Sequence, residues 1–254
     1  MFECKIPLFN PAPLRKEILE SMRDLAISEQ AARYSEYSDG ILAGCELFEQ
    51  NMKIGVTNGL VKFAGQVYVL DKPDSVPYQA TDAWTVLKIQ FGGEKLSRDF
   101  SVYEGCLILD ENTHVLPNEI ELGRFKLKQG SRLRTKYEDF QDMETEYDTV
   151  NPFNVPYAGI GEHTLMPVIL TYFAREAYPY AHEVSDLAFC TCCLANSGVM
   201  SRESIRLYLW RRFNLNGVMF DNRELHARLA DALAEIKGET RQGGQGQSDG
   251  IWMP

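Results

Sequence analysis

The first strong pattern along the chain is an amphipathic helix that precedes a β-rich segment. From Leu14 to Tyr37, apolar residues recur at spacings of three, four or seven, and charged residues occupy the other side. At ~1.5 Å per residue, this helix is about 35 Å long. A leading helix of this kind packs either on a neighbouring chain or on its own β module, and both alternatives stay open. We expect Ile18, Met22 and Leu25 to be partner-contact residues.

The residues before this helix form a separate short segment. Phe2 to Phe9 is an apolar–polar stretch that reads as a strand or an arm, and Pro11 and Pro13 end it. Pro13 suits the first turn of the helix, where a missing backbone N–H has no consequence.

Short apolar and β-branched runs follow from Ile41 to Arg134. They are separated by glycines or by polar pairs such as Gln50-Asn51 and Asn58-Gly59. This spacing predicts about seven antiparallel strands joined by tight turns, arranged as a small sandwich or a barrel.

The composition changes after the last of these strands. Tyr137–Val150 holds six carboxylates. Asn151–Gly161 is a loop with two prolines and two glycines. From Glu162 onward the pattern is helical, with helices predicted over about 164–178, 183–196, 201–213 and 221–237. Ser201 is a good N-cap for the third, and Asp221 with Glu224 resembles a capping box that opens the fourth.

These patterns predict an α+β chain with four parts. Residues 1–38 form an arm and a long N-terminal helix, residues 39–150 an antiparallel β domain, residues 151–237 a C-terminal helical domain, and residues 238–254 a flexible tail. The tail is rich in Gly and Gln and ends in Ile251-Trp252-Met253. It either docks on a partner, docks on the protein's own groove, or is a disordered terminus. Under the docking alternatives, Trp252 and Met253 are contact residues.

Composition narrows the class of protein. The chain has 254 residues, with 44% hydrophobic and 24% charged, as in soluble globular proteins. A net charge of -10 disfavours wrapping nucleic acid or lying on an anionic membrane. The longest apolar runs are too short to span a bilayer, and the first residues do not form a signal peptide. We therefore expect a protein that is made and kept in a cytoplasm, or that is assembled there into something larger.

The cysteines are candidates for metal binding. Cys190, Cys192 and Cys193 crowd together inside an apolar helical stretch, and His182 lies eight residues before the first of them. A zinc site needs C-x-x-C pairs or a His/Cys set at usable spacing, which this crowding does not provide. We interpret them as small buried hydrophobes and expect no cofactor.

Two further hypotheses give the chain a different function, and the first is an enzyme. The acidic run from Glu138 to Asp148, together with His163, could serve a metal-dependent hydrolase. However, Phe140, Met143 and Tyr147 interleave in the run at helical spacing. A solvated helix face or an interface strip is therefore favoured.

The other reading is a DNA-binding or regulatory protein. The helix pair over 187–213 contains a Gly-bearing turn and a second helix with four arginines, which is typical of a helix-turn-helix motif. The acidic net charge and the apolar residues on the same helix count against it. The arginines are Arg202, Arg206, Arg211 and Arg212.

One order of motifs resembles a known family. Asp39–Gly44 reads DGILAG, and after a short strand Gly59–Leu70 reads GLVKFAGQVYVL. This order is similar to the β module of baseplate and tail-associated proteins of tailed bacteriophages and related contractile tail-like particles. Glu121–Leu127, with Gly130 and Leu133-Arg134, resembles the segment that follows in prophage-encoded members. The resemblance covers about residues 14–151.

The resemblance implies a structural protein rather than an enzyme, so no catalytic residue is carried over. It implies a subunit of a phage tail or tail-like particle at the baseplate, present in several copies and held by contacts with other tail proteins. Such a subunit resides in a virion or tail-like particle that is assembled in the bacterial cytoplasm. It implies neither membrane insertion nor nucleic-acid binding.

Overall fold

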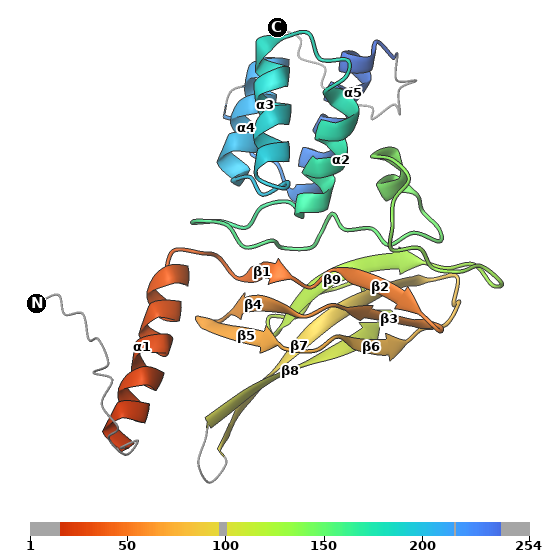
Figure 1. The fold of residues 1–254 in the computed structure, drawn as a ribbon. Helices are drawn as coiled ribbons and strands as arrows, with labels where there is room; N and C mark the ends of the chain where they lie inside the picture. Colours follow the sequence, from red (N-terminus) through yellow and green to blue (C-terminus); the bar gives the residue numbers. More distant parts are fainter. Residues whose placement is uncertain (1–15, 97–100, 216, 240–254) are drawn as a thin grey trace, which may run out of the picture. The chain divides into compact units, whose positions relative to one another are not determined.

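The computed structural model describes residues 16–96, 101–215 and 217–239 (Figure 1). The chain divides into two compact units, residues 1–36 and 37–254. The described part of the first unit is helix α1 (Lys16–Tyr34), which forms most of the predicted N-terminal helix. Glu17 in its first turn and Arg33 in its last turn complement the helix dipole.

The β part of the second unit consists of three small antiparallel sheets. Their strand orders are β1-β4-β5, β2-β3-β6 and β8-β7-β9. The strands are β1 (Gly40–Gly44), β2 (Leu47–Gln50), β3 (Lys53–Val56), β4 (Gly59–Phe63), β5 (Gln66–Leu70), β6 (Asp74–Pro77), β7 (Trp84–Leu96), β8 (Ser101–Asp110) and β9 (Glu119–Lys126).

The described residues thus contain nine strands, where the sequence predicts about seven. The additional strands include β6, which pairs with β3 in a proline-containing segment that has no strand pattern of its own. Two turns lie at breaks that the sequence predicts. Asn51 and Met52 turn β2 into β3 with φ of 54° and 59°, and Ala64 and Gly65 turn β4 into β5 with φ of 48° and 78°. None of the three sheets closes into a barrel within the described residues, so the barrel alternative is wrong there.

One hydrophobic core joins the three sheets. Its buried side chains come from the short sheets and from the long one, and they include Ile41, Ile54, Val61, Leu87, Phe91, Leu122 and Phe125. The loop before the helices also pairs with β1, since Ile41 N donates to Pro156 O at 2.9 Å and Ala158 N donates to Ile41 O at 2.8 Å. Gly40 permits this approach, because a Cβ there would lie 2.5 Å from Pro156 O.

The helical part follows the predicted order. It contains α2 (Pro167–Ala177), α3 (Val184–Ala195), α4 (Arg202–Phe213) and α5 (Asn222–Lys237). The predicted N-cap is confirmed, since the Ser201 side chain accepts from Ser204 N. The predicted capping box is also confirmed: Glu224 N donates to Asp221 Oδ1 at 2.7 Å, and Asp221 N donates to Glu224 Oε2 at 2.8 Å.

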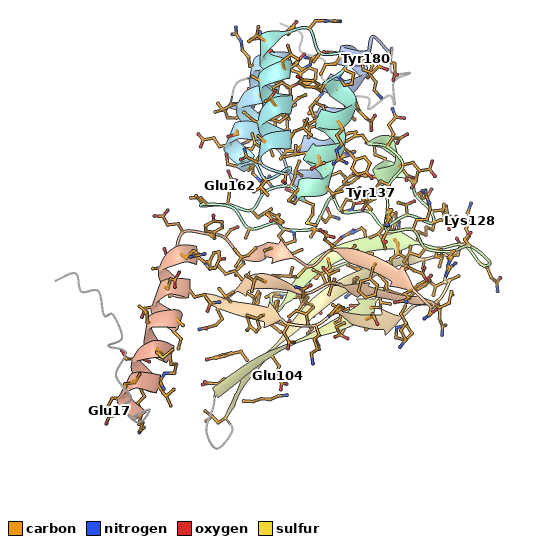
Figure 2. All side chains as sticks on the ribbon, viewed as in Figure 1. Glu17, Glu104, Lys128, Tyr137, Glu162 and Tyr180 are labelled. Atoms are coloured by element: carbon orange, nitrogen blue, oxygen red, sulfur yellow. The ribbon has the colours of Figure 1, made fainter. Side chains whose placement is uncertain are left out.

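The segment before α2 connects the sheets to the helices. Tyr137 Oη donates to Val150 O at 2.8 Å, and Tyr172 Oη on α2 donates to Tyr137 O at 2.8 Å. Figure 2 labels Tyr137 and Glu162 on this segment. Met166 packs against both the sheet core and the helical core, so the two cores are adjacent.

Candidate functional site

Helix α1 presents the predicted contact residues on one face. Ile18, Met22 and Leu25 are spaced by four and three residues, so they share a side of the helix. Their exposed fractions are 43%, 59% and 64%, and no residue of α1 is buried. The structure therefore brings these three side chains together, and their role in partner contact stays a prediction. Trp252 and Met253 lie outside the described residues.

Two further exposed apolar residues on α1 were missed by the sequence analysis. Leu19 flanks the face defined by Ile18, Met22 and Leu25, whereas Ile27 lies about 180° away from Ile18 at 100° per residue. The helical period would have located both. Ile27 provides a natural control, because it is as exposed as Met22 but faces the other way.

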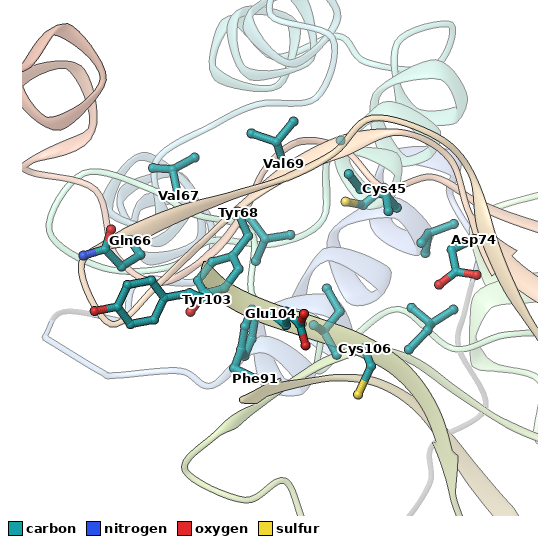
Figure 3. A pocket seen from close by; sticks show the side chains of 17 residues that line it. Cys45, Gln66, Val67, Tyr68, Val69, Asp74, Phe91, Tyr103, Glu104 and Cys106 are labelled. Carbon is teal, nitrogen blue, oxygen red and sulfur yellow. The ribbon is translucent and has the colours of Figure 1, made fainter. Parts of the chain in front are cut away.

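A groove lies between strands β5 and β8. Its volume is about 590 Å³, and its walls carry Tyr68 from β5, Phe91 from β7, and Tyr103 and Leu107 from β8 (Figure 3). The Tyr68 and Phe91 rings lie 4.6 Å apart, and Phe63 stacks on Phe91 at 4.1 Å. Gly105 lies opposite Phe91 in the β7–β8 ladder and contributes no side chain, which leaves the aromatic floor open. The groove is mostly apolar, and Gln66, Asp74 and Glu104 are the polar residues with long or charged side chains that also line it.

A buried cation, Lys88, lies on β7, the central strand of the β8-β7-β9 sheet. Lys88 is completely buried, and its Nζ donates to Asp110 Oδ2 at 2.9 Å and to His114 O at 2.8 Å, with Glu119 Oε2 at 3.1 Å. Burial alone would lower the pKa of Lys88, but its bonds to Asp110 and Glu119 outweigh burial and raise it. Glu119 also accepts from Leu116 N at 3.0 Å. This cluster anchors the loop between β8 and β9, which is a structural role.

The acidic run does not form the predicted helix face. Within it the structure has only a single 3-10 turn, Gln141–Glu144. Phe140 and Met143 are buried in the helical core instead, which overrides the helical spacing of the run. Several of its carboxylates pair with cations of the same chain: Asp142 with Arg134 at 2.6 Å, and Glu146 with Lys126 at 2.9 Å.

The pairing of Asp142 predicts an acid-sensitive contribution to stability. Burial would raise the pKa of Asp142, but the bonds from Arg134 and from Glu138 N outweigh burial, so its pKa lies below the usual value. A depressed carboxyl pKa adds stability above the unfolded pKa of about 3.9, and this stability is lost as the pH falls through the folded pKa. Asp142→Asn should therefore destabilise the protein by about 1.5–3 kcal/mol at neutral pH.

The difference in free energy of unfolding between Asp142→Asn and the wild type should shrink below about pH 4, because the wild type loses the contribution of Asp142 there. Urea unfolding at neutral and at acidic pH measures this difference. Glu138→Gln is the control, since Glu138 pairs with the same Arg134 but its side chain is 84% exposed. A gap between Asp142→Asn and the wild type that is equal at both pH values would contradict the assignment.

The arginines of the predicted DNA-binding helix are largely engaged inside the protein. Arg202 donates to His163 O and Phe220 O, each at 2.8 Å, and to the Asn222 side chain. Arg206 pairs with Glu162, which lies on the exposed segment before α2 (Figure 2). Arg212 pairs with Asp186 at 2.6 Å and with Glu235 at 3.2 Å. Three of the four guanidinium groups are thus directed at partners within the chain rather than at solvent.

The cysteine stretch lies on α3. Cys190 and Cys193 are fully buried in the helical core, whereas Cys192 is exposed, so the expectation of buried residues is correct for two of the three. Burial raises the pKa of Cys190 to about 11 and that of Cys193 to about 12, which keeps both thiols protonated and unreactive at neutral pH. Across the described ranges, no group of three or more His, Cys, Asp and Glu side chains is placed to hold a metal ion.

Among the helices of the described residues, none is both long and apolar enough to cross a bilayer.

Comparisons with known proteins give only distant likenesses. No family model matches the chain, and no curated protein matches it. The crystal structure of TssK aligns over 92% of this chain and 71% of that chain, with a TM-score of 0.43 and 8% identity. A cryo-electron microscopy structure of the type VI secretion system TssK-TssF-TssG baseplate subcomplex aligns over 92% and 99%, with a TM-score of 0.35 and 10% identity.

Proposed function

We propose that this chain is a structural subunit of the baseplate of a phage tail or tail-like particle, present in several copies and acting through protein–protein contacts. The observation that carries the proposal is the α1 helix, whose 19 residues include no buried side chain. A helix of this length is marginal alone in water, and helices in proteins gain most of their stability from packing an apolar face. We therefore infer that the apolar face of α1 packs on a partner, which stabilises the helix.

The motif order of residues 39–70 supports the same class of protein, because it resembles the β module of tail and baseplate proteins. The proposal assigns the chain no catalytic chemistry. The partners are other baseplate proteins and further copies of this chain, within a particle assembled in the bacterial cytoplasm. The two alternatives draw no support from the geometry, since the arginines of α4 and the carboxylates of the acidic run are engaged in contacts within the chain.

The spacing along α1 specifies the kind of contact. Ile18, Met22, Leu25 and Ala32 fall on the four-and-three spacing of a coiled-coil seam, with Glu29 at the one polar position. A polar residue at one seam position sets register and number of strands at some cost in stability. We therefore infer that α1 associates with the α1 helices of other copies.

The test is the mass of the full-length protein in solution across a range of concentrations. Leu25→Lys should weaken self-association by about tenfold or more, because it places a charge in the apolar face that the proposed association would bury. Ile27→Lys adds the same charge on the opposite face and should leave the mass unchanged. Equal effects of the two variants, or a wild type that stays monomeric, would count against this use of α1.

A further inference from the structure

Strands β5 and β8, which border the groove, each have one open edge. Among the described residues, β5 pairs only with β4 and β8 pairs only with β7. Outside these ladders, no backbone hydrogen bond of the described residues involves Gln66–Leu70 or Ser101–Asp110. An open edge of N–H and C=O groups is a docking site for an extended peptide, which adds a strand to the sheet.

The β4–β5 ladder determines which residues of β5 face the open edge. The tight two-residue turn between the strands makes Phe63 and Gln66 a hydrogen-bonded pair, so Tyr68 also bonds toward β4. Val67 and Val69 alternate with these residues and direct their N–H and C=O groups to the open edge. Both valines line the groove, and their side chains lie on the opposite side of the strand from Tyr68 (Figure 3). The groove is therefore bordered by backbone that a ligand can pair with.

The side chains of the groove define the chemistry of that ligand. Tyr68, Phe91 and Tyr103 form an aromatic wall (Figure 3). Asp74 and Glu104 are the charged residues of the lining, and no lysine or arginine of the described residues lines the groove. Glu104 already has a cationic partner on β7, whereas Asp74 is exposed and pairs with no cation in the described part of the chain. A complementary ligand is apolar and carries one positive charge for Asp74.

We propose that the groove is a docking site for an extended segment of a partner protein, added as an antiparallel strand along β5. Successive side chains of a strand point to opposite faces, so the segment has an apolar residue at every second position. These residues contact the aromatic wall, and a lysine or arginine on the same face pairs with Asp74. Asp74 lies at the end of the groove away from Gln66, so the cation precedes the apolar residues in an antiparallel segment (Figure 3).

The open edge favours a peptide over a small apolar ligand. Val67 and Val69 are two residues apart, which is the spacing at which a neighbouring strand repeats its hydrogen bonds. Only an extended backbone pairs with both. The groove lies in the compact unit of residues 37–254, whereas α1 belongs to the other unit, so this is a second contact surface beyond the one in the proposed function.

Binding of a synthetic peptide to the full-length protein tests the groove. The probe is acetyl-Lys-Thr-Val-Thr-Val-Thr-Val with a fluorophore at its C-terminus, in which the lysine and the valines share one face. We expect saturable binding, measured by fluorescence anisotropy. A peptide with glutamate in place of the lysine should bind about tenfold more weakly. A peptide with the valines and threonines exchanged has the same composition but puts the lysine on the other face, and it should also bind about tenfold more weakly.

A reciprocal charge change locates the cation of the peptide. Asp74→Lys should bind the lysine peptide about tenfold more weakly than the wild type does, and it should prefer the glutamate peptide. Asp74 is exposed at the start of β6, so this change leaves the core intact. An Asp74→Lys protein that still prefers the lysine peptide would overturn the placement of the cation.

Three further variants test the added strand and the wall. Val69→Pro removes an N–H at the open edge that the β4 ladder does not use, and it should weaken binding about tenfold while circular dichroism stays unchanged. Tyr103→Ser removes part of the aromatic wall and should weaken binding by a similar factor. Met52→Ser is the control, because Met52 is about as exposed as Tyr103 but lies in the turn between β2 and β3 and does not line the groove.

The outcomes separate the parts of the proposal. Absent binding, or equal losses in Tyr103→Ser and Met52→Ser, would overturn the groove as a docking site. Binding that Tyr103→Ser weakens and a folded Val69→Pro leaves unchanged would assign the groove to an apolar ligand without an added strand. If Val69→Pro does not fold, the exchanged peptide and the Asp74→Lys variant decide. The assay does not involve α1, so its failure is distinct from failure of the Leu25→Lys test.

Discussion

Lys88→Met is expected to lower the free energy of unfolding of the β part by about 3–5 kcal/mol. The ammonium group is fully buried between Asp110 and Glu119, and the Glu119 side chain is only 2% exposed. Methionine has a similar length but no charge, so the variant leaves the Glu119 carboxylate buried without its cation. It also removes the donor to His114 O that holds the loop after β8. Removing one partner from a buried ion pair lowers the free energy of unfolding by more than the net contribution of the pair, because the other charge stays buried without a partner.

Urea unfolding followed by the fluorescence of Trp84, which lies in the same strand, measures this effect. Lys95→Met is the matched control, because Lys95 also lies on β7 and pairs with Glu104. Both of these side chains are more than half exposed. Exposed pairs contribute about 0–1 kcal/mol, so the control should unfold close to the wild type. If both variants shift the midpoint equally, the cluster around Lys88 is not a stabilising element.

The sequence predicted the elements whose signals are local. The Ser201 cap, the capping box of Asp221 and the α1 helix depend on residues within a few positions of one another, so their pattern is visible before folding. The short strands were predicted from glycines and polar pairs, and the turns at Asn51-Met52 and Ala64-Gly65 lie at such breaks.

Features that depend on distant residues were not predicted. Lys88 alternates with apolar residues in β7 as a solvent-facing residue would, but Asp110, 22 positions further on, neutralises it. The groove was also missed, because it depends on the order of strands in space, which places the open edges of β5 and β8 next to each other. The only local signal was Gly105 inside a strand, since an interior glycine often marks a close approach of another chain or ligand.

Asp186→Ala is expected to destabilise the helical part by about 3–5 kcal/mol. The buried Asp186 carboxylate on α3 accepts from Tyr208 Oη at 2.9 Å and from Arg212 Nη1 at 2.6 Å, both on α4. Alanine leaves the buried Tyr208 hydroxyl without this acceptor and the Arg212 guanidinium without its main counter-charge. Asp231→Ala is the control, because Asp231 pairs with Arg228 within α5 and both side chains are partly exposed, so the variant should change stability by about 0.5 kcal/mol or less. Urea unfolding followed by far-ultraviolet circular dichroism compares the two.

The outcome also bears on the alternative in which α3 and α4 bind DNA. That reading needs the arginines of α4 to reach phosphates, whereas the structure directs Arg212 at Asp186. A large loss of stability in Asp186→Ala means that Arg212 is held by a strong internal contact, and turning it toward a phosphate would cost a similar free energy. If Asp186→Ala instead unfolds with the wild type, Arg212 is free to leave Asp186 at little cost. A salt-dependent shift on duplex DNA would then become the decisive measurement, because phosphate contacts weaken steeply with added salt.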